Sequence, residues 1–357
     1  MAGSRAARDP ASRIAAWQLR AGRHELPWQT THDPYRIWLS EIMLQQTQAT
    51  TVIPYYQRFL TRFPDLQTLA DAPLDAVLQA WAGLGYYARA RNLHRCAQAI
   101  RDQHGGAFPR TAAALSTLPG IGESTAAAVA AFAFGERAAI LDGNVRRVLA
   151  RYHALEADPG SSAALRQLWS WAHEWLAQAP TDLDMGAYTQ GQMDLGATIC
   201  TRSNPNCGQC PLAEACEARR QGRQQELPRP RTRRVQPERH CHILVAECDH
   251  ALLLERRPER GIWGGLWSLP QFDTHEELEA FCRQLGAAAP PVRMAAFEHV
   301  FTHFRLHLQP WRLRLDAPAP STLEAARAWI PATGLIQHGM PAPISRLLTG
   351  LQESGCG

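Results

Sequence analysis

Apolar positions recur at helical spacing through the first 222 residues, and the breaks between apolar stretches carry proline, glycine or aspartate. A repeat near 3.6 residues with such breaks predicts short amphipathic helices. The strict alternation expected of strands is scarce in this part of the chain. The sequence therefore predicts an all-α domain with helices over 17–26, 34–50, 53–63, 74–80, 89–103, 112–118, 124–134, 143–153, 163–178 and 188–199.

The pattern changes twice after residue 222. Residues 223–240 combine arginine, glutamine and proline with few apolar residues, which is typical of a solvated linker whose arginines can also contact phosphates. Beyond the linker, "HCHILVAE", "ALLLERR" and "RLHLQPWRLRL" predict strands, and "THEELEAFCRQLG" predicts a helix. We therefore expect a multidomain protein: a helical domain over 1–222, a basic linker over 223–240, and a smaller α+β domain over 241–350.

Composition adds limits to this picture. The 357 residues are enough for two domains, and 45% hydrophobic content suits a packed protein. The net charge of +4 is modest, so any nucleic-acid binding must rest on local clusters of arginine. No apolar run approaches the roughly 20 residues of a membrane span, and the first residues lack the apolar core of a signal peptide. We therefore expect a cytoplasmic protein.

Four of the nine cysteines lie together in "CTRSNPNCGQCPLAEAC". In a reducing compartment such a cluster indicates a metal centre and not disulfides. Thiolates select zinc or iron–sulfur centres, and zinc sites usually show two close pairs of cysteines. Here one close pair has a single cysteine on each side, which favours an iron–sulfur cubane acting as a structural staple. The predicted ligands are Cys200, Cys207, Cys210 and Cys216.

The stretch "LPGIGEST" places two glycines and a proline ahead of the apolar run "AAAVAAFAF". Glycine allows a tight turn and a close approach by another molecule, and backbone amides at the following helix start attract an anion. The stretch predicts a helix beginning near Ser124 or Thr125, with a hairpin suited to a DNA phosphate. A plain helix–turn–helix corner has the same sequence signature.

Two acidic residues stand out in the helical half. Asp142 in "LDGNVRRVL" is predicted to cap the next helix, and that structural role alone would explain it. Glu41 in "WLSEIMLQQTQ" falls among apolar neighbours, so we expect partial burial and a raised pKa. An exposed helical glutamate is the alternative for Glu41.

These stretches, together with "GLGYYARARNLH" and the four-cysteine loop, resemble the helix–hairpin–helix DNA glycosylases that carry an iron–sulfur cluster, and among them the adenine DNA glycosylases. The resemblance implies one 4Fe–4S cluster and a monomer, located on DNA in the nucleoid. It also implies a monofunctional enzyme of base excision repair. Its substrate would be double-stranded DNA with adenine mispaired with 8-oxoguanine or guanine, and it would hydrolyse the N-glycosidic bond of that adenine.

The resemblance also assigns catalytic roles. It makes Glu41 the acid that protonates the departing base, and Asp142 the stabiliser of the cationic sugar or a transient nucleophile, two roles that the chain leaves open. Asn144 would support Asp142 by hydrogen bonding. Ser124 stands where the related endonuclease III has a lysine that attacks the sugar, so no Schiff base is expected here.

Contacts with DNA follow from the same resemblance. Glutamine and tyrosine side chains would fill the duplex around the extruded nucleotide, and the hairpin would grip a phosphate. Arg202 and Arg219 near the cluster are further candidates for phosphate contacts. The implied DNA-binding residues are Gln45, Gln46, Tyr86, Leu118, Gly120, Gly122 and Gln190.

The second domain, with "GIWGGLWSLPQF" ahead of "THEELEAF", resembles a Nudix hydrolase. The glutamates of 276–279 lack the spacing and the arginine of the Nudix magnesium box, so we expect recognition and not pyrophosphatase activity. Phe301, Thr302 and His303 match a Phe–Ser–His loop that reads 8-oxoguanine in the family. Threonine replaces serine in this chain and keeps the hydroxyl.

Two other functions fit parts of the sequence. One is an endonuclease III-like bifunctional glycosylase/lyase, which the missing lysine at position 124 disfavours. The other is a non-catalytic iron–sulfur protein that binds DNA, which the presence of both Glu41 and Asp142 disfavours.

Overall fold

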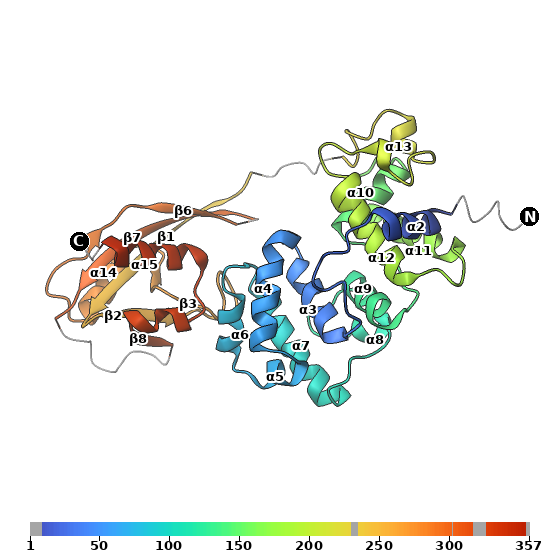
Figure 1. Ribbon diagram of the computed structural model, residues 1–357. Coiled ribbons are helices and arrows are strands. Elements are labelled where there is room, and N and C mark those ends of the chain that lie inside the picture. The colour runs from blue at the N-terminus through green and yellow to red at the C-terminus, as the bar shows by residue number, and fades with distance from the viewer. Residues whose placement is uncertain (1–8, 230–234, 302, 317–325, 355–357) are drawn as a thin grey trace, which may run out of the picture. The chain divides into compact units, whose positions relative to one another are not determined.

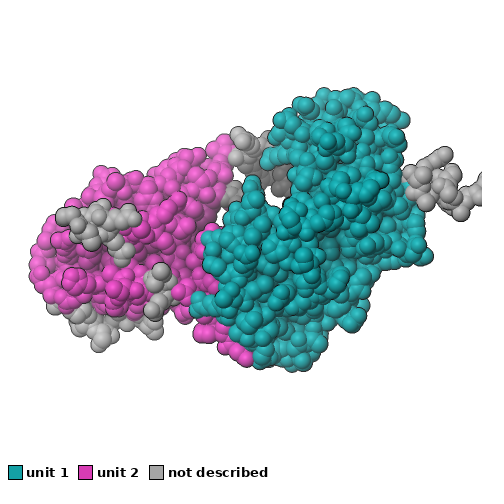
Figure 2. Space-filling view, in the orientation of Figure 1, with its two compact units in different colours: residues 1–70, 95–233 teal, residues 71–94, 234–357 magenta. Residues whose placement is uncertain are grey.

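The computed structural model describes residues 9–229, 235–301, 303–316 and 326–354. The chain forms two compact units, one of residues 1–70 and 95–233 and one of residues 71–94 and 234–357 (Figure 2). The first is helical and the second is built on a mixed sheet (Figure 1). The predicted fold class is confirmed. None of the described helices is long and apolar enough to cross a bilayer.

The core of the first unit lies around α9, which spans Glu123–Phe134. Six consecutive residues of α9, 126–131, are buried, as expected for a helix that is apolar on every side. Alanine at these positions lets neighbouring helices approach closely. The other elements of this part of the chain are α2 (Pro10–Ala21), α3 (Pro34–Leu44), α4 (Ala49–Arg62), α5 (Leu66–Asp71), α7 (Ala88–His104), α8 (Ala112–Leu115), α10 (Gly143–Tyr152), α11 (Ser162–Gln178), α12 (Met185–Asp194), η1 (Leu195–Ile199), η2 (Cys207–Gln209) and α13 (Glu217–Arg220).

Several predicted helices were wrong in their limits, among them those over 53–63, 112–118 and 188–199, which are α4, α8 and α12 followed by η1. Two others have a clear physical reason. The helix expected over 17–26 is α2, which begins at Pro10 because the Asp9 side chain accepts hydrogen bonds from the first turn. The helix expected over 34–50 ends at Leu44, and α4 begins at Ala49. Gln46 between them has φ of 59°, and a left-handed residue cannot continue a right-handed helix.

The sheet of the second unit centres on β1 (Glu238–Cys248), which pairs in parallel with β7 (Arg305–Arg314) and antiparallel with β2 (Ala251–Arg256). The strand order is β3–β2–β1–β7–β5, with β4 on β1, β6 on β7 and β8 on β2. The three strands and the helix predicted here are present. The remaining elements are β3 (Trp267–Ser268), β4 (Gln271–Phe272), α14 (His275–Gln284), β5 (Val292–Arg293), β6 (Phe297–Val300), β8 (Arg327–Pro331), η3 (Ala332–Gln337) and α15 (Ala342–Ser354).

Helix α14 covers part of this sheet. Its Leu278 and Phe281 pack in one apolar cluster with Leu244 of β1 and Leu253 of β2. Residues 71–94, which include α6 (Leu74–Trp81), belong to the same compact unit as the sheet. Within that unit, Asp75 and Arg256 form an ion pair of 2.7 Å.

Candidate active site

One wide cavity in the first unit gathers most of the residues singled out from the sequence. It is open to solvent, has a volume of about 820 Å³, and is bordered by the end of α3, the turn at 45–48, the starts of α9 and α10, and α12. That volume lies in the upper part of the ~300–1,000 Å³ range of ligand pockets, so a group the size of a nucleoside fits. The sequence-predicted residues that line it are Glu41, Gln45, Gln46, Ser124, Asp142, Asn144 and Gln190.

Glu41 reaches the cavity from the middle of α3 and is half-buried. Burial raises the pKa of its carboxyl to about 8, and the negative charge of Asp142 acts in the same direction. Among the residues that the structure describes, none donates a hydrogen bond that would stabilise the charged form. Glu41 is therefore mainly a neutral acid at pH 7, as the apolar sequence around it predicted.

Asp142 is the N-cap of α10, where the sequence placed it. Its carboxylate accepts hydrogen bonds from the Val145 N–H at 2.7 Å and the Asn144 Nδ2 at 3.4 Å. Burial raises the pKa of Asp142, whereas these hydrogen bonds and the Arg147 charge oppose that effect. Asp142 thus has stabilisers of its charged form that Glu41 does not, and two carboxyls in different surroundings are suited to different roles.

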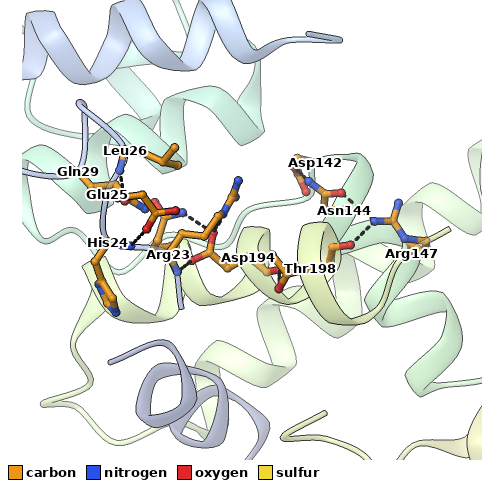
Figure 3. Close-up of polar contacts among 12 residues, drawn as sticks. Arg23, His24, Glu25, Leu26, Gln29, Asp142, Asn144, Arg147, Asp194 and Thr198 are labelled. Carbon is orange, nitrogen blue, oxygen red and sulfur yellow. Dashed lines mark hydrogen bonds and ion pairs between the residues drawn. The ribbon is translucent and has the colours of Figure 1, made fainter. Parts of the chain in front are cut away.

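Asn144 is held in place from the side opposite Asp142 (Figure 3). Arg147 donates to Asn144 Oδ1 at 2.8 Å, to the Gly196 carbonyl at 2.6 Å and to the Cys200 carbonyl at 2.7 Å. Because Asn144 Oδ1 accepts from Arg147, its amide nitrogen must face Asp142. A Cβ at Gly196 would lie 2.5 Å from Asn144 Cβ, so only glycine allows this approach.

Ser124 lies in the first turn of α9, which begins at Glu123 beside the predicted start. Its Oγ accepts a hydrogen bond of 2.9 Å from the N–H of Leu141, the residue before Asp142. Ser124 therefore ties the start of α9 to the backbone that carries the catalytic candidate.

The hairpin ahead of α9 has the turn that its glycines suggested. Gly120 has φ of 76°, and Gly122 is an N-cap with no side-chain hydrogen bond to the helix. Both glycines are exposed, which leaves backbone amides for an anion. The Leu118 side chain is instead only 5% exposed, and its backbone N–H donates to the Leu115 carbonyl at 3.1 Å, so Leu118 serves the turn itself.

A second polar network borders the cavity, and sequence reasoning missed two of its three members. The fully buried Asp194 accepts from Arg23 Nε at 2.7 Å and from the Arg23 backbone N–H at 2.9 Å (Figure 3). It also accepts from Gln190 Nε2 at 2.8 Å. A carboxylate only accepts, so the Gln190 amide nitrogen must face Asp194. The Gln190 carbonyl oxygen remains to accept a hydrogen bond from a ligand.

The four predicted cysteine ligands border one small apolar cavity. Cys200 follows η1, Cys207 opens η2, Cys210 follows η2, and Cys216 precedes α13. The buried guanidinium of Arg151 donates to Cys200 Sγ at 3.4 Å and to backbone carbonyls of the same loop. Converging thiols, apolar walls and a cation beside sulfur fit the negative charge of an iron–sulfur cluster.

The remaining predicted residues divide between the two units. Arg202 borders the active-site cavity, and Arg219 borders the cysteine cavity. Tyr86 belongs to the second unit, is 46% exposed and has φ of 50°.

The predicted lesion-reading loop lies wholly in the second unit. Phe301 stacks on Phe304 with ring centroids 4.5 Å apart, and His303 is exposed. Thr302 lies outside the described residues. The loop therefore offers an aromatic stack and an exposed imidazole at one place on the surface.

The chain matches three sequence families. They are the HhH-GPD superfamily of base excision DNA repair proteins over residues 39–174, the iron–sulfur binding domain of endonuclease III over 200–216, and the NUDIX domain over 241–350. The second match shows that the cysteine loop is an iron–sulfur site. The first and third cover the helical part and the sheet.

Relatives and a solved structure extend this likeness. The adenine DNA glycosylase of Buchnera aphidicola subsp. Baizongia pistaciae is 33% identical over 342 residues, which cover 95% of this chain and 96% of the relative. The human adenine DNA glycosylase is 34% identical, with 86% of this chain and 68% of the relative covered. The structure of a thermostable thymine-DNA glycosylase has a TM-score of 0.53 and 28% identity, and covers 62% of this chain and 100% of that one.

Proposed function

This chain belongs to the adenine DNA glycosylase family of base excision repair enzymes, and from that premise we propose that it hydrolyses the N-glycosidic bond of adenine mispaired with 8-oxoguanine or guanine in double-stranded DNA. The observation that carries the proposal is that Glu41 and Asp142 line one cavity while burial raises the pKa of Glu41 to about 8.

Glu41 supplies the proton that the departing adenine needs. As the C–N bond breaks, its electron pair leaves with the base, and a neutral carboxylic acid can neutralise the charge that develops there. The Glu41 carboxylate that remains can accept a proton from the water that adds to C1′. An unperturbed glutamate would be ionised at pH 7 and could not begin this cycle.

Asp142 stabilises the positive charge that the broken bond leaves on the sugar. Its hydrogen bonds from Val145 and Asn144 favour the carboxylate that this role requires. The same carboxylate could form a transient bond to C1′, and both roles need it held at a fixed place facing the cavity. Asn144 provides part of that placement, with Arg147 fixing the orientation of its amide.

Ser124 makes this a glycosylase without lyase activity. A Schiff base needs an amine near C1′, and position 124 offers a hydroxyl whose oxygen already accepts from Leu141. Ser124 contributes by holding the backbone ahead of Asp142, and the DNA strand stays intact after base release.

DNA is gripped around this cavity. Gln46 at the rim of the cavity is exposed with a left-handed backbone and enters the duplex near the extruded nucleotide. Tyr86, in the second unit, is also exposed with a left-handed backbone and is a second residue for insertion into the duplex. Gln45 lies beside Gln46 at the same turn. Gln190 offers its carbonyl oxygen to the amino group of adenine, an orientation that Asp194 supports. The amides at Gly120 and Gly122 bind a phosphate.

The second unit reads the base opposite adenine. Phe301 supplies a stacking surface, and His303 and Thr302 supply polar groups for 8-oxoguanine. The exposure of His303 beside the Phe301–Phe304 stack supports this assignment.

The iron–sulfur site holds one 4Fe–4S cluster on Cys200, Cys207, Cys210 and Cys216. When bound, the cluster supplies a fixed anchor for the loop, and the Cys200 carbonyl receives the Arg147 hydrogen bond that leads to Asn144. The enzyme acts as a monomer.

The test is single-turnover adenine release from three duplexes that pair adenine with 8-oxoguanine, guanine or thymine. Strand breakage is scored before and after hot alkali. We expect fast release opposite 8-oxoguanine, slower release opposite guanine, almost none opposite thymine, and breakage only after alkali.

Each other outcome contradicts a defined part of the proposal. Breakage without alkali would contradict the role of Ser124. Equal rates opposite 8-oxoguanine and guanine would contradict lesion reading by residues 301–303. No release from any duplex, with DNA bound and the cluster present, would contradict the catalytic assignment of Glu41 and Asp142.

A further inference from the structure

Three side chains at the start of β1 and β7 converge in a way that no part of the glycosylase reaction uses. They are Glu238, His240 and His307, and one nitrogen or oxygen of each lies within 4.8 Å of the others. We propose that this cluster binds one divalent transition-metal ion, of which zinc is the best fit.

Strand pairing brings the three residues to one face. β1 and β7 are parallel, and His240 lies directly opposite His307 in their register. Side chains alternate along a strand, so Glu238 shares the face of His240. The two imidazole rings are stacked with centroids 4.8 Å apart, which is the spacing of neighbouring strands. The backbone thus places all three side chains on one face before any ion arrives.

One pair of ligand atoms already has the spacing of a tetrahedral zinc site. With metal–ligand bonds of about 2.0–2.1 Å, two tetrahedral ligands lie about 3.3 Å apart. Glu238 Oε2 and His307 Nε2 are already 3.4 Å apart. The widest pair in the cluster is 4.8 Å or less, so a side-chain rotation completes the set.

His307 has an unsatisfied atom at this place. Its Nε2 is buried and has no hydrogen-bond partner within the described part of the chain, although it faces the Glu238 carboxylate. Buried polar atoms are nearly always paired, so one without a partner needs an explanation. A metal ion between His307 and Glu238 would satisfy both groups.

The local charge also permits a cation. Arg305 lies opposite Glu238, but its guanidinium contacts both Glu298 oxygens at 2.8 Å and is compensated there. Arg239 belongs to the other face of β1, where its guanidinium lies 4.7 Å from the centroid of the Phe304 ring. The Glu238 charge also acts on Arg305, but the hydrogen bonds of that guanidinium go to Glu298, so the Glu238 oxygens can face the ion.

The donor set selects the kind of metal. Two imidazoles and one carboxylate suit zinc and its neighbours, whereas calcium and magnesium require mainly oxygen ligands. Three protein ligands leave a fourth position for water.

β1 is the first strand after the linker, and β7 directly follows Phe304, so a bound ion would join the starts of both strands beside the proposed lesion-reading loop.

The experiment measures zinc binding to the full-length, cluster-loaded protein in competition with a chromophoric chelator. We expect one zinc per protein, and a loss of affinity on the order of 100-fold or more in His307→Asn and His240→Asn. The matched control is His104→Asn, which removes an exposed imidazole at the end of α7 and should bind as the parent does. Glu238→Gln, at an exposed position, repeats the test if a histidine variant folds poorly.

X-ray absorption at the zinc edge identifies the ligands. We expect only nitrogen and oxygen scatterers, and slower hydrogen exchange at the start of β7 when zinc is bound. Sulfur in the zinc shell would place the ion on the cluster cysteines and overturn the proposal. Unchanged affinity in His307→Asn and Glu238→Gln would overturn it as well. Neither readout depends on base release, so the proposed glycosylase activity can fail while this site stands.

Discussion

The cavity of the first unit and helix α14 of the second both present carboxyl groups, but they put them to opposite uses. In the cavity, burial raises the pKa of Glu41 to about 8 and raises that of Asp142. On α14, a backbone hydrogen bond and one with the Thr274 side chain lower the pKa of the exposed Glu276, and Glu277 closes a capping box with Thr274. The acid suited to proton transfer is thus made by its surroundings, because the same side chain on an exposed helix stays ionised.

The largest expected effect separates these two regions by activity. Replacing Glu41 with glutamine keeps the size of the side chain and removes the proton, so the single-turnover rate of adenine release should fall by about 10²–10⁴-fold. The matched change Glu276→Gln on α14 should leave that rate within about twofold of the parent, since no acid chemistry is assigned there.

Duplex affinity and cluster absorbance control for folding in both variants. The conclusion that acid chemistry belongs to the cavity and not to α14 is contradicted if Glu276→Gln slows base release as much as Glu41→Gln does. It is also contradicted if neither variant slows base release.

Asp142→Asn should slow single-turnover adenine release by about 10²–10³-fold, somewhat less than Glu41→Gln does. The loss arises because the substitution removes the charge that faces the sugar. Asparagine caps a helix as well as aspartate does, so α10 should keep its stability. Rate and melting temperature are measured on the same preparation. A fall in melting temperature that accounts for the lost activity would reduce Asp142 to a structural cap.

The sequence predicted this region in part, and the limit is physical. Glu41 and Asp142 lie in contiguous motifs, so local pattern was enough to place one on an apolar helix and the other at a helix start. Arg23 and Asp194 meet across 171 positions with no local signal, and their ion pair exists only once the helices pack.

The break in the helix expected over 34–50 has a similar origin. Nothing in the composition around Gln46 announces a left-handed residue, since glutamine is a good helix former. The left-handed residue therefore reflects the tertiary structure, in which residues 45–48 form a turn at the rim of the cavity.

The pH dependence of stability sharpens the comparison by a different route. The pKa of Glu41 is raised from 4.5 to about 8 on folding, so between these values the folded protein keeps a proton that the unfolded chain has lost. Stability therefore falls as pH rises through this window, and Glu41→Gln should not share that fall. The melting temperature of the parent should drop relative to that of the variant up to about pH 8, by roughly 2–4 °C for each kcal/mol of unfolding free energy lost. Above about pH 8 the two melting temperatures should change in parallel.

Glu276→Gln is the control in the same pH series. The lowered pKa of Glu276 gives the opposite sign, with stability lost only as pH falls below 4.5, so the variant should follow the parent at neutral and alkaline pH. If the melting temperatures of Glu41→Gln and the parent change in parallel between pH 4.5 and about 8, Glu41 is solvated like the α14 acids.

The smallest effect tests the structural use of the α14 carboxyls. Thr274 Oγ1 accepts from the Glu277 N–H at 3.2 Å, and Glu277 reaches back to the Thr274 N–H at 3.4 Å. Thr274→Ala opens this capping box and should lower the stability of the second unit by about 0.5–2 kcal/mol, whereas Thr274→Ser, which keeps the hydroxyl, should lose little. Urea unfolding followed by hydrogen exchange in α14 measures the difference.

Because the cap supports the sheet and not the chemistry, the rate of adenine release should be unchanged in both variants. A tenfold slower release in Thr274→Ala at matched DNA occupancy would mean that α14 serves the reaction, and the division between the two regions would fail.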